Sequence, residues 1–255
     1  MALLSALRKS SLAFFFCLVV ALVPQRAAAQ CEDRGTVVEE GVSNVQGKPF
    51  QAKQITTIVF YNADGSKSTK VTKANLFRDS KGRIRVERFY DGTENPLENM
   101  PTDVIIDDNC GTVFILRPSD HTVKIQKMPP SPTPSNHPVC AEVDSKNPPG
   151  AGNPKDKFED LGHKFVDGVE IRGERWSSYS SEKAKASGAP PVEVRENWCS
   201  MALQNQVGGY ILNDNPKQEI ITVVSDIQQG EPDSALFEIP TGYKTIETGK
   251  PNAAP

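Results

Sequence analysis

Histidine, the side chain that most often acts as a general acid or base near neutral pH, occurs three times in the 255 residues. His121 lies in a turn sequence, His137 lies in a proline-rich stretch, and His163 lies within an alternating segment. Nothing in the sequence groups these histidines, and no motif supplies an orienting partner for any of them. The sequence therefore predicts no catalytic histidine.

Catalytic sequence motifs are also absent. The chain has no G-x-S-x-G nucleophile elbow, no H-E-x-x-H motif, no P-loop and no dinucleotide-binding glycine pattern. Carboxylates are abundant, as in Glu39-Glu40 and Asp107-Asp108, but glycosidase chemistry needs two of them at a set separation across a cleft. We predict no cofactor and favour a non-enzymatic protein, with a hydrolase acting on envelope polymers as the alternative.

Two clusters of oxygen ligands could in principle hold a cation. Residues 107–109 (Asp-Asp-Asn) and 213–215 (Asn-Asp-Asn) carry the side chains that Ca²⁺ prefers. Both lack the spaced ligands and bidentate glutamate of an EF-hand loop, and turns rich in Asp and Asn explain them. No cysteine lies in a C-x-x-C motif, which disfavours zinc. We therefore predict no metal site.

Residues 1–29 have the pattern of a secretory signal peptide. Arg8 and Lys9 form a positive n-region, and Ala27-Ala28-Ala29 supplies the small residues that a signal peptidase needs. The apolar run between them covers residues 11–23, shorter than the roughly 20 residues that span a bilayer. We expect cleavage after Ala29 and a periplasmic or secreted protein, an uncleaved anchor being the alternative. Gln30 before Cys31 disfavours lipidation.

Four cysteines remain after cleavage: Cys31, Cys110, Cys140 and Cys199. An even number in an exported chain predicts disulfide bonds, with three possible pairings. Cys110 and Cys140 flank an apparent hairpin and the proline-rich stretch. We therefore expect these two to pair, which leaves Cys31 with Cys199.

The composition narrows the range of partners. The formal net charge is −3 and no block of like charge occurs, so neither nucleic acid nor an anionic membrane surface is indicated. No second long apolar run follows the signal, and we expect no transmembrane segment in the mature chain. The sequence does not indicate an oligomeric state.

Alternating apolar and polar residues, typical of β-strands, recur along the mature chain. Eight prolines between residues 129 and 157 predict a long loop there. A helical turn is expected only at residues 232–237. The expected strands cover residues 55–61, 67–77, 83–90, 104–106, 112–117, 122–127, 158–165, 169–176, 192–199, 206–212 and 219–227.

These elements predict one β-rich domain over residues 30–247, interrupted by the loop at 129–157, and a disordered tail at 248–255. The fold class is mainly β: an antiparallel, strongly curled sheet (a half-barrel, barrel or sandwich) with little helix. Two alternatives stay open for its apolar face, a packed core and an open cleft. In the expected strands 169–176 and 192–199, the alternating apolar positions are Val169, Ile171, Val192, Val194 and Trp198. We expect Trp198 to pack in the core rather than to stack on a sugar.

The C-terminal half also carries a series of recognisable segments. Residues 194–198 read VRENW, and residues 230–240 read GEPDSALFEIP, followed by Tyr243. This series resembles uncharacterised secreted proteins of soil bacteria, Acidobacteria in particular, over roughly residues 50–247. The strand-rich plan that ends in Leu-Phe-x-Ile-Pro more distantly resembles the periplasmic lipoprotein carriers.

The second resemblance implies a curled half-barrel whose apolar concave face holds acyl chains. The carriers close that face with helices, whereas this chain has its proline-rich loop in the corresponding place. We therefore expect a non-enzymatic exported envelope protein that binds an apolar ligand, lipid or lipoprotein-like, or a partner protein. A purely structural envelope protein is the further alternative.

Overall fold

A computed structural model describes residues 38–39, 41–90, 103–107, 110–127, 139–142 and 153–246. The chain divides into two units, Met1–Gln30 and Cys31–Pro255, and all described residues belong to the second. The predicted signal peptide and the predicted tail at 248–255 lie outside the described residues. Most of the proline-rich loop does so as well.

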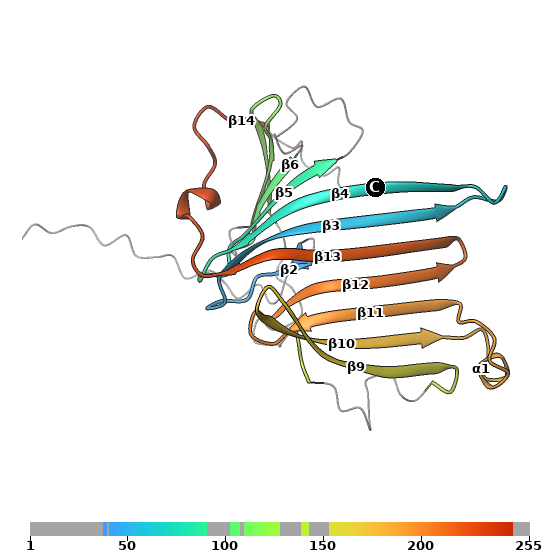
Figure 1. Ribbon diagram of the computed structural model, residues 1–255. Helices are drawn as coiled ribbons and strands as arrows, with labels where there is room; N and C mark the ends of the chain where they lie inside the picture. The colour runs from blue at the N-terminus through green and yellow to red at the C-terminus, as the bar shows by residue number, and fades with distance from the viewer. Residues whose placement is uncertain are drawn as a thin grey trace, which may run out of the picture. The chain divides into compact units, whose positions relative to one another are not determined.

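Twelve of the described strands form one sheet (Figure 1). Its order is β14-β8-β7-β6-β5-β4-β3-β13-β12-β11-β10-β9, and every neighbouring pair is antiparallel except β14 and β8. A separate pair joins β1 (Val38–Glu39) and β2 (Val42–Ser43). The strands of the sheet are β3 (Phe50–Tyr61), β4 (Lys67–Arg78), β5 (Ile84–Tyr90), β6 (Asp103–Asp107), β7 (Thr112–Arg117), β8 (Thr122–Lys127), β9 (Asp156–Val166), β10 (Val169–Ser178), β11 (Glu193–Ser200), β12 (Asn205–Asp214), β13 (Lys217–Gln229) and β14 (Lys244–Ile246).

The topology is two meanders joined at the middle of the sheet. β3 to β8 follow one another outward, and β9 to β13 follow one another inward until β13 pairs with β3. The proline-rich stretch therefore connects β8, near one edge of the sheet, with β9 at the other edge. Short turns suffice for most of the other connections, because antiparallel neighbours can be joined by a tight hairpin.

The structure confirms a mainly β, antiparallel fold, and each predicted strand is present. β7 and β8 have the predicted bounds, and residues 234–237 form a 3₁₀ helix, η1 (Ser234–Phe237). The elements β1, β2, β14 and α1 (Glu182–Ala186) were not predicted, because each is too short to show a period. The described strands do not close into a barrel or curl strongly, so the half-barrel stays a prediction.

The buried core lies on both sides of the sheet. Leu76 belongs to one cluster, with Phe50 and Val42, and its neighbour Phe77 packs against a second, with Val104. Successive side chains of a strand point to opposite faces, so at β4 the clusters lie on opposite faces. We call the face that carries Leu76 face A and the face that carries Phe77 face B.

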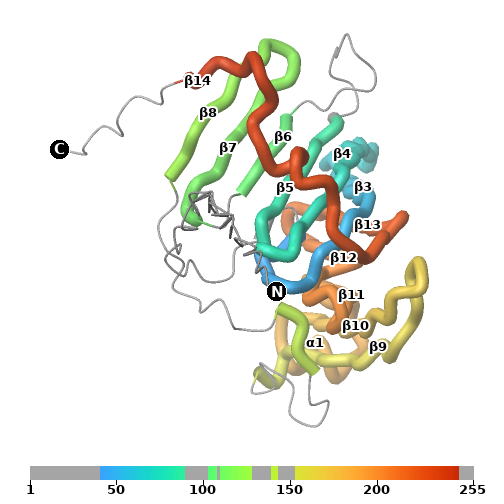
Figure 2. The backbone as a smooth tube through the Cα atoms, turned by 90° about the vertical axis from the view of Figure 1, so that its left-hand side faces the viewer, coloured from blue at the N-terminus to red at the C-terminus, as the bar shows by residue number. Residues whose placement is uncertain are grey.

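Each face is covered by a different end of the domain. On face A, β2 contributes Val42 to the core. On face B, Leu236 and Phe237 of η1 and Tyr243 pack on the second cluster. Figure 2 shows the C-terminal segment crossing β5 before it reaches β14 beside β8.

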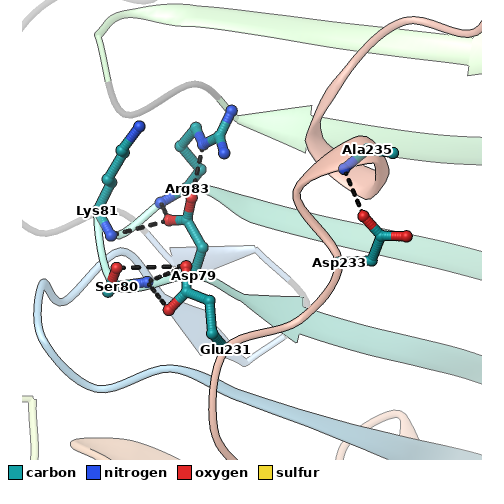
Figure 3. A network of polar contacts seen from close by, with 7 residues as sticks. All are labelled: Asp79, Ser80, Lys81, Arg83, Glu231, Asp233 and Ala235. Carbon is teal, nitrogen blue, oxygen red and sulfur yellow. Dashed lines mark hydrogen bonds and ion pairs between the residues drawn. The ribbon is translucent and has the colours of Figure 1, made fainter.

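Polar contacts fix the C-terminal segment to the turn between β4 and β5 (Figure 3). The Glu231 carboxylate accepts hydrogen bonds from the amide and the hydroxyl of Ser80, at 3.1 Å and 3.2 Å. Asp79 accepts from the amide and the Nε of Arg83, at 2.8 Å and 2.6 Å. The Arg83 guanidinium in turn lies 4.8 Å from the ring centre of Phe237. Residues of the GEPDSALFEIP segment thus have a structural role.

Val192, which the sequence predicts on the apolar face of its strand, is not buried. Val169, Ile171 and Val194 are buried as predicted, but Val192 is 37% exposed. Val192 directly precedes β11. Its amide donates a hydrogen bond to the carbonyl of Ser178, at the end of β10, and its carbonyl accepts one from the amide of Asp214, at the end of β12. Because Val192 belongs to neither core cluster, its side chain stays partly in solvent.

No helix within the described part of the chain is long and apolar enough to cross a membrane.

Candidate functional site

A cavity of about 340 Å³ lies against β11, β12 and β13. Thr222 of β13 lines the cavity and pairs with Thr56 of β3, and Thr56 pairs with Thr72 of β4. Thr72 lies four residues before Leu76 on the same strand, so the side chains of both residues point to face A. The floor therefore belongs to face A, since side chains of paired residues share a face. The lining residues include Ser43, Asn197, Gln206, Ile211, Ile220 and Thr222.

The wall at Ser43 is held by buried backbone contacts. Ser43 is fully buried, its amide donates to Asn205 Oδ1 at 3.1 Å, and its carbonyl accepts from Arg78 Nη1 at 2.7 Å. Arg78 also donates to the carbonyls of Lys48 and Leu203. Burial lowers the pKa of Arg78 to about 10, which leaves it charged at neutral pH. The position of Ser43 is therefore fixed by partners from β4 and β12.

A disulfide bond holds a second wall, the segment 139–142. Cys140 is bonded to Cys199 of β11, with the two Cα atoms 5.8 Å apart. The Gln204 side chain adds two hydrogen bonds to the backbone of Cys140, at 3.2 Å and 3.1 Å. These contacts keep Val139, next to Cys140, at the cavity.

The disulfide corrects the predicted pairing. We expected Cys110 with Cys140 and Cys31 with Cys199, because Cys110 and Cys140 are near in sequence. The sheet instead brings segment 139–142 to the end of β11, 59 residues further along the chain. Cys110 is disulfide-bonded as well, and Cys31 lies outside the described residues.

A glycine opens the floor of the cavity. Gly209 pairs with Asn197, and a Cβ at Gly209 would stand 2.7 Å from Nε2 of Gln206. The absent side chain thus leaves room for the Gln206 amide, which donates to the Gly208 carbonyl at 3.2 Å. Glycines inside a strand often mark such a close approach.

Two buried polar atoms of the cavity residues have no hydrogen-bond partner in the described structure. They are the hydroxyl oxygen of Ser43 and Oδ1 of Asn197. Leaving a buried polar atom unsatisfied costs about 1–3 kcal/mol.

The charged residues at the cavity are paired with neighbouring side chains. Arg195 forms an ion pair with Glu193, and its side chain is 67% exposed. Glu196 accepts a hydrogen bond from Arg175 Nε at 2.7 Å. The cavity therefore presents neutral polar atoms beside the apolar side chains of Ile211 and Ile220.

An apolar row continues from the cavity across face A. Ile211 pairs with Ile220, and Ile220 pairs with Ile58 of β3. In the other direction, past Arg195, Trp176 and Phe158 pair with their ring centres 4.8 Å apart. All five apolar side chains of this row are half-buried: Ile58, Phe158, Trp176, Ile211 and Ile220. An extended apolar group could lie along this row with a polar end in the cavity.

The structure does not bring the histidines together. His121 lies in the turn between β7 and β8, with its ring centre 5.5 Å from that of Tyr243. His163 lies on β9, exposed, with Nδ1 3.2 Å from a carboxylate oxygen of Glu170. His137 lies outside the described residues. Neither described histidine lines the cavity.

Two carboxylates do lie near a tryptophan, on β9 and β10. Asp160 and Glu174 pair directly, and Trp176 is two residues further on. Arg172 binds Asp160 at 2.7 Å, and this hydrogen bond lowers the pKa of Asp160. A glycosidase general acid needs a raised pKa, so Asp160 does not have the electrostatics of that acid.

Of the two oxygen-rich turns, residues 213–215 are described in full and residues 107–109 only in part. Asp107 is buried at the end of β6, and residues 108 and 109 lie outside the described part. Asn213 and Asp214 end β12. Among the described residues, no group of three or more His, Cys, Asp and Glu side chains could hold a metal ion.

Sequence reasoning missed the polar residues of the cavity. Ser43 and Asn205 are in contact although 162 residues separate them. One local signal was available, the Gly208-Gly209 pair inside a predicted strand, which indicates a close approach of another group. Trp198 was correctly expected to pack against the core.

No protein-family model and no curated protein matches the sequence. Among solved structures, the chain is similar to an uncharacterized conserved protein from Thermus thermophilus, at 12% identity and a TM-score of 0.40, covering 78% of this chain and 90% of that one. It is similar to a LolA superfamily protein from Nitrosomonas europaea at 9% identity and a TM-score of 0.33, covering 75% and 90%. It is also similar to the lipoprotein LppX of Mycobacterium tuberculosis at 9% identity and a TM-score of 0.32, covering 71% and 87%.

The neighbours include a LolA superfamily protein and a lipoprotein, each at 9% identity, and nothing among them bears on the resemblance to proteins of Acidobacteria. TM-scores below 0.5 at such identities assign no residue and no activity. The function of this chain therefore has to be inferred from the cavity and the apolar row.

Proposed function

We propose that this protein is a non-enzymatic, exported envelope protein that binds an amphipathic ligand, a lipid or a lipid-modified protein, on face A. The carrying observation is the cavity that continues into the apolar row of Ile211, Ile220 and Ile58. A polar group would occupy the cavity, and a chain would cover the row.

The size of the cavity supports this division. About 340 Å³ is near the lower end of the roughly 300–1,000 Å³ typical of small-molecule sites. A head group and the first part of a chain fit such a volume, and the rest of the chain needs the row outside it. Covering half-exposed apolar side chains contributes about 25 cal/mol for each Å² removed from water.

Export is supported by two independent features. The first 29 residues have the pattern of a cleavable signal, and Cys140–Cys199 is a disulfide bond. Disulfides form and persist outside the reducing cytosol. The periplasm or the medium is the compartment in which both features make sense.

The proposal is tested by native mass spectrometry of the protein purified without detergent from its own envelope fraction. We expect an additional mass in the lipid range that solvent extraction removes. A bare mature mass before extraction would contradict the proposal. The same spectrum shows whether cleavage follows Ala29 and whether Cys31 carries a lipid.

A pair of neighbouring substitutions shows which face binds. Ile220 lies in the cavity, whereas Ile221 points to face B and is 38% exposed. We expect Ile220→Glu to abolish the bound mass and Ile221→Glu to retain it. Loss of the ligand in both variants, or in neither, would contradict the assignment to face A.

A partner protein is a second candidate, favoured by an apolar patch on face B. Ile55 and Val223 pair across β3 and β13 and are 43% and 53% exposed, next to Ile221. Under this alternative, Ile221→Glu disrupts complex formation in the envelope fraction and Ile220→Glu does not. Size-exclusion chromatography of that fraction distinguishes the two candidates.

A further inference from the structure

We infer that two copies of this chain associate edge to edge through β9, which pairs antiparallel with itself about a two-fold axis. The inference does not depend on the ligand proposed for face A. Three features carry it: a free strand edge, an order of residues along that edge that is complementary to itself, and a bulge that keeps the complementary side chains on the same face.

β9 lies at one edge of the sheet (Figure 1). It pairs with β10 along its whole length on the inner side, and none of the described strands pairs with its outer side. An edge strand directs backbone N–H and C=O groups away from the sheet, where a further strand can bind them. Lys185 Nζ donates to the carbonyl of Asp156, so the free edge runs from Lys157 to Val166.

The residues along this edge are complementary to themselves in the reverse direction. Residues 158–165 read FEDLGHKF, with acids before the centre, bases after it and a phenylalanine at each end. Antiparallel pairing centred between Leu161 and Gly162 therefore sets acids opposite bases and phenylalanine opposite phenylalanine. The pairs between the two copies, each made twice by the two-fold axis, are Phe158–Phe165, Glu159–Lys164 and Asp160–His163. Aromatic pairs and opposite charges at directly opposite positions stabilise a sheet.

The charges on the edge favour this register over its neighbours. Moving the second copy by two residues in one direction would bring Lys157 opposite Lys164, and like charges at opposite positions destabilise a pair of strands. Moving it by two residues in the other direction would set Asp160 opposite Phe165. Charged residues at an edge usually oppose association, but in this order they select one pairing.

A β-bulge brings the two phenylalanines to the same face. Side chains alternate along a regular strand, so Phe158 and Phe165, an odd number of residues apart, would point to opposite faces. The register between β9 and β10 shifts at Leu161, which adds one residue to β9 at this point. Phe158 pairs with Trp176, and Phe165 pairs with Glu170. Because Trp176 and Glu170 are an even number of residues apart on β10, both phenylalanines point to face A.

The same bulge keeps the charged pairs on matching faces. The four charged or titratable residues of the complementary pairs lie opposite these positions of β10: Glu159 opposite Arg175, Lys164 opposite Ile171, Asp160 opposite Glu174 and His163 opposite Arg172. For each acid and the base that it would meet, the two β10 positions are an even number of residues apart. Each acid therefore shares a face with its base, as direct pairing between the two copies requires.

The side chains at this edge are accessible. Phe165 is 70% exposed, more than any other large apolar side chain of the described structure, and the side chain of His163 is 58% exposed. In the dimer Phe165 lies beside Phe158 of the second copy, which removes apolar surface from water. A single pair of strands buries less surface than an obligate interface, so we expect a reversible dimer with a dissociation constant in the micromolar range.

Sedimentation velocity of the mature protein between about 1 and 100 μM tests the inference. We expect a reversible monomer–dimer equilibrium, and we expect Phe165→Glu to weaken the dimer at least about tenfold, because it sets a carboxylate against an apolar ring. Ile246→Glu, at an exposed position of β14 on the opposite edge, is the control and should leave the equilibrium unchanged. A monomer at every concentration, or a dimer that Phe165→Glu leaves equally strong, would overturn the inference.

Charge reversal tests the register. Glu159→Lys or Lys164→Glu sets like charges opposite each other twice in a homodimer, and each should weaken it at least about tenfold. An equal mixture of the two variants should recover the dimer, because one copy then carries bases at both positions and the other carries acids at both. Native mass spectrometry of the mixture should show heterodimers in excess over either homodimer. Mixing cannot repair a misfolded variant, and a mixture that dimerises no better than the separate variants would overturn the inference.

Discussion

The indole of Trp198 on β11 lies against Gly173 on β10, where a Cβ would stand 2.5 Å from the ring. The two residues pair directly, and Trp198 also pairs with Gly208 of β12 on its other side. One large side chain thus lies between two glycines on neighbouring strands. The arrangement packs Trp198 against the core cluster that contains Leu76.

Gly173→Ala should destabilise the protein by about 1–3 kcal/mol, because the new methyl group would force the indole to shift. Gly208→Ala is the matched control, since its Cβ would meet its neighbours at 3.5 Å or more, an ordinary contact. Urea denaturation of both variants measures the difference. Equal stability of the two would show that the Trp198 ring has room to move.

Arg78→Lys should lower the free energy of unfolding by about 2 kcal/mol or more. The guanidinium binds the carbonyls of Ser43, Lys48 and Leu203, and a single ammonium group on a thinner side chain cannot satisfy all three. The exposed Arg117→Lys at the end of β7 is the control and should be neutral. Thermal unfolding of the three proteins provides the measurement, and a neutral Arg78→Lys would contradict this account of the buried arginine.

Removing the Cys140–Cys199 disulfide by a Cys140→Ala, Cys199→Ala double substitution should destabilise the domain by about 2–4 kcal/mol. The bond joins residues 59 positions apart, which limits the freedom of the unfolded chain. Non-reducing peptide mapping of the natural protein should link the peptides that contain Cys140 and Cys199. A peptide that joined Cys110 to Cys140 would refute this pairing.

Phe237→Ala should cost about 3–5 kcal/mol, because Phe237 is 6% exposed and packs in the face-B cluster with Val104 and Leu116. Ile239→Ala, two residues along the same segment, replaces a side chain that is 37% exposed and should cost less than about 1 kcal/mol. Hydrogen exchange should show loss of protection in β14 and β8 in the first variant only. Similar exchange in both variants would mean that η1 does not anchor the C-terminal segment.

The local elements of this protein were open to prediction because their signals are local. Strands such as β7 and β8 are bounded by a turn of Pro, Ser, Asp and His, and side chains alternate along them with a period of two residues. The same signals placed the hairpin between β12 and β13. They also predicted a mainly antiparallel β-protein with few helices.

The sequence by itself therefore determined the eleven strands from β3 to β13, the pattern of an export signal and the even set of cysteines, since each of these depends on local sequence alone. Tertiary structure alone decided that Cys140 meets Cys199 and that Ser43 meets Asn205 and Arg78. These contacts depend on which strands become neighbours, and that follows from packing of the whole sheet rather than from any local pattern. The cavity arises from the same cause, because its floor on β11 to β13 and its wall at Ser43 come from segments far apart in the chain.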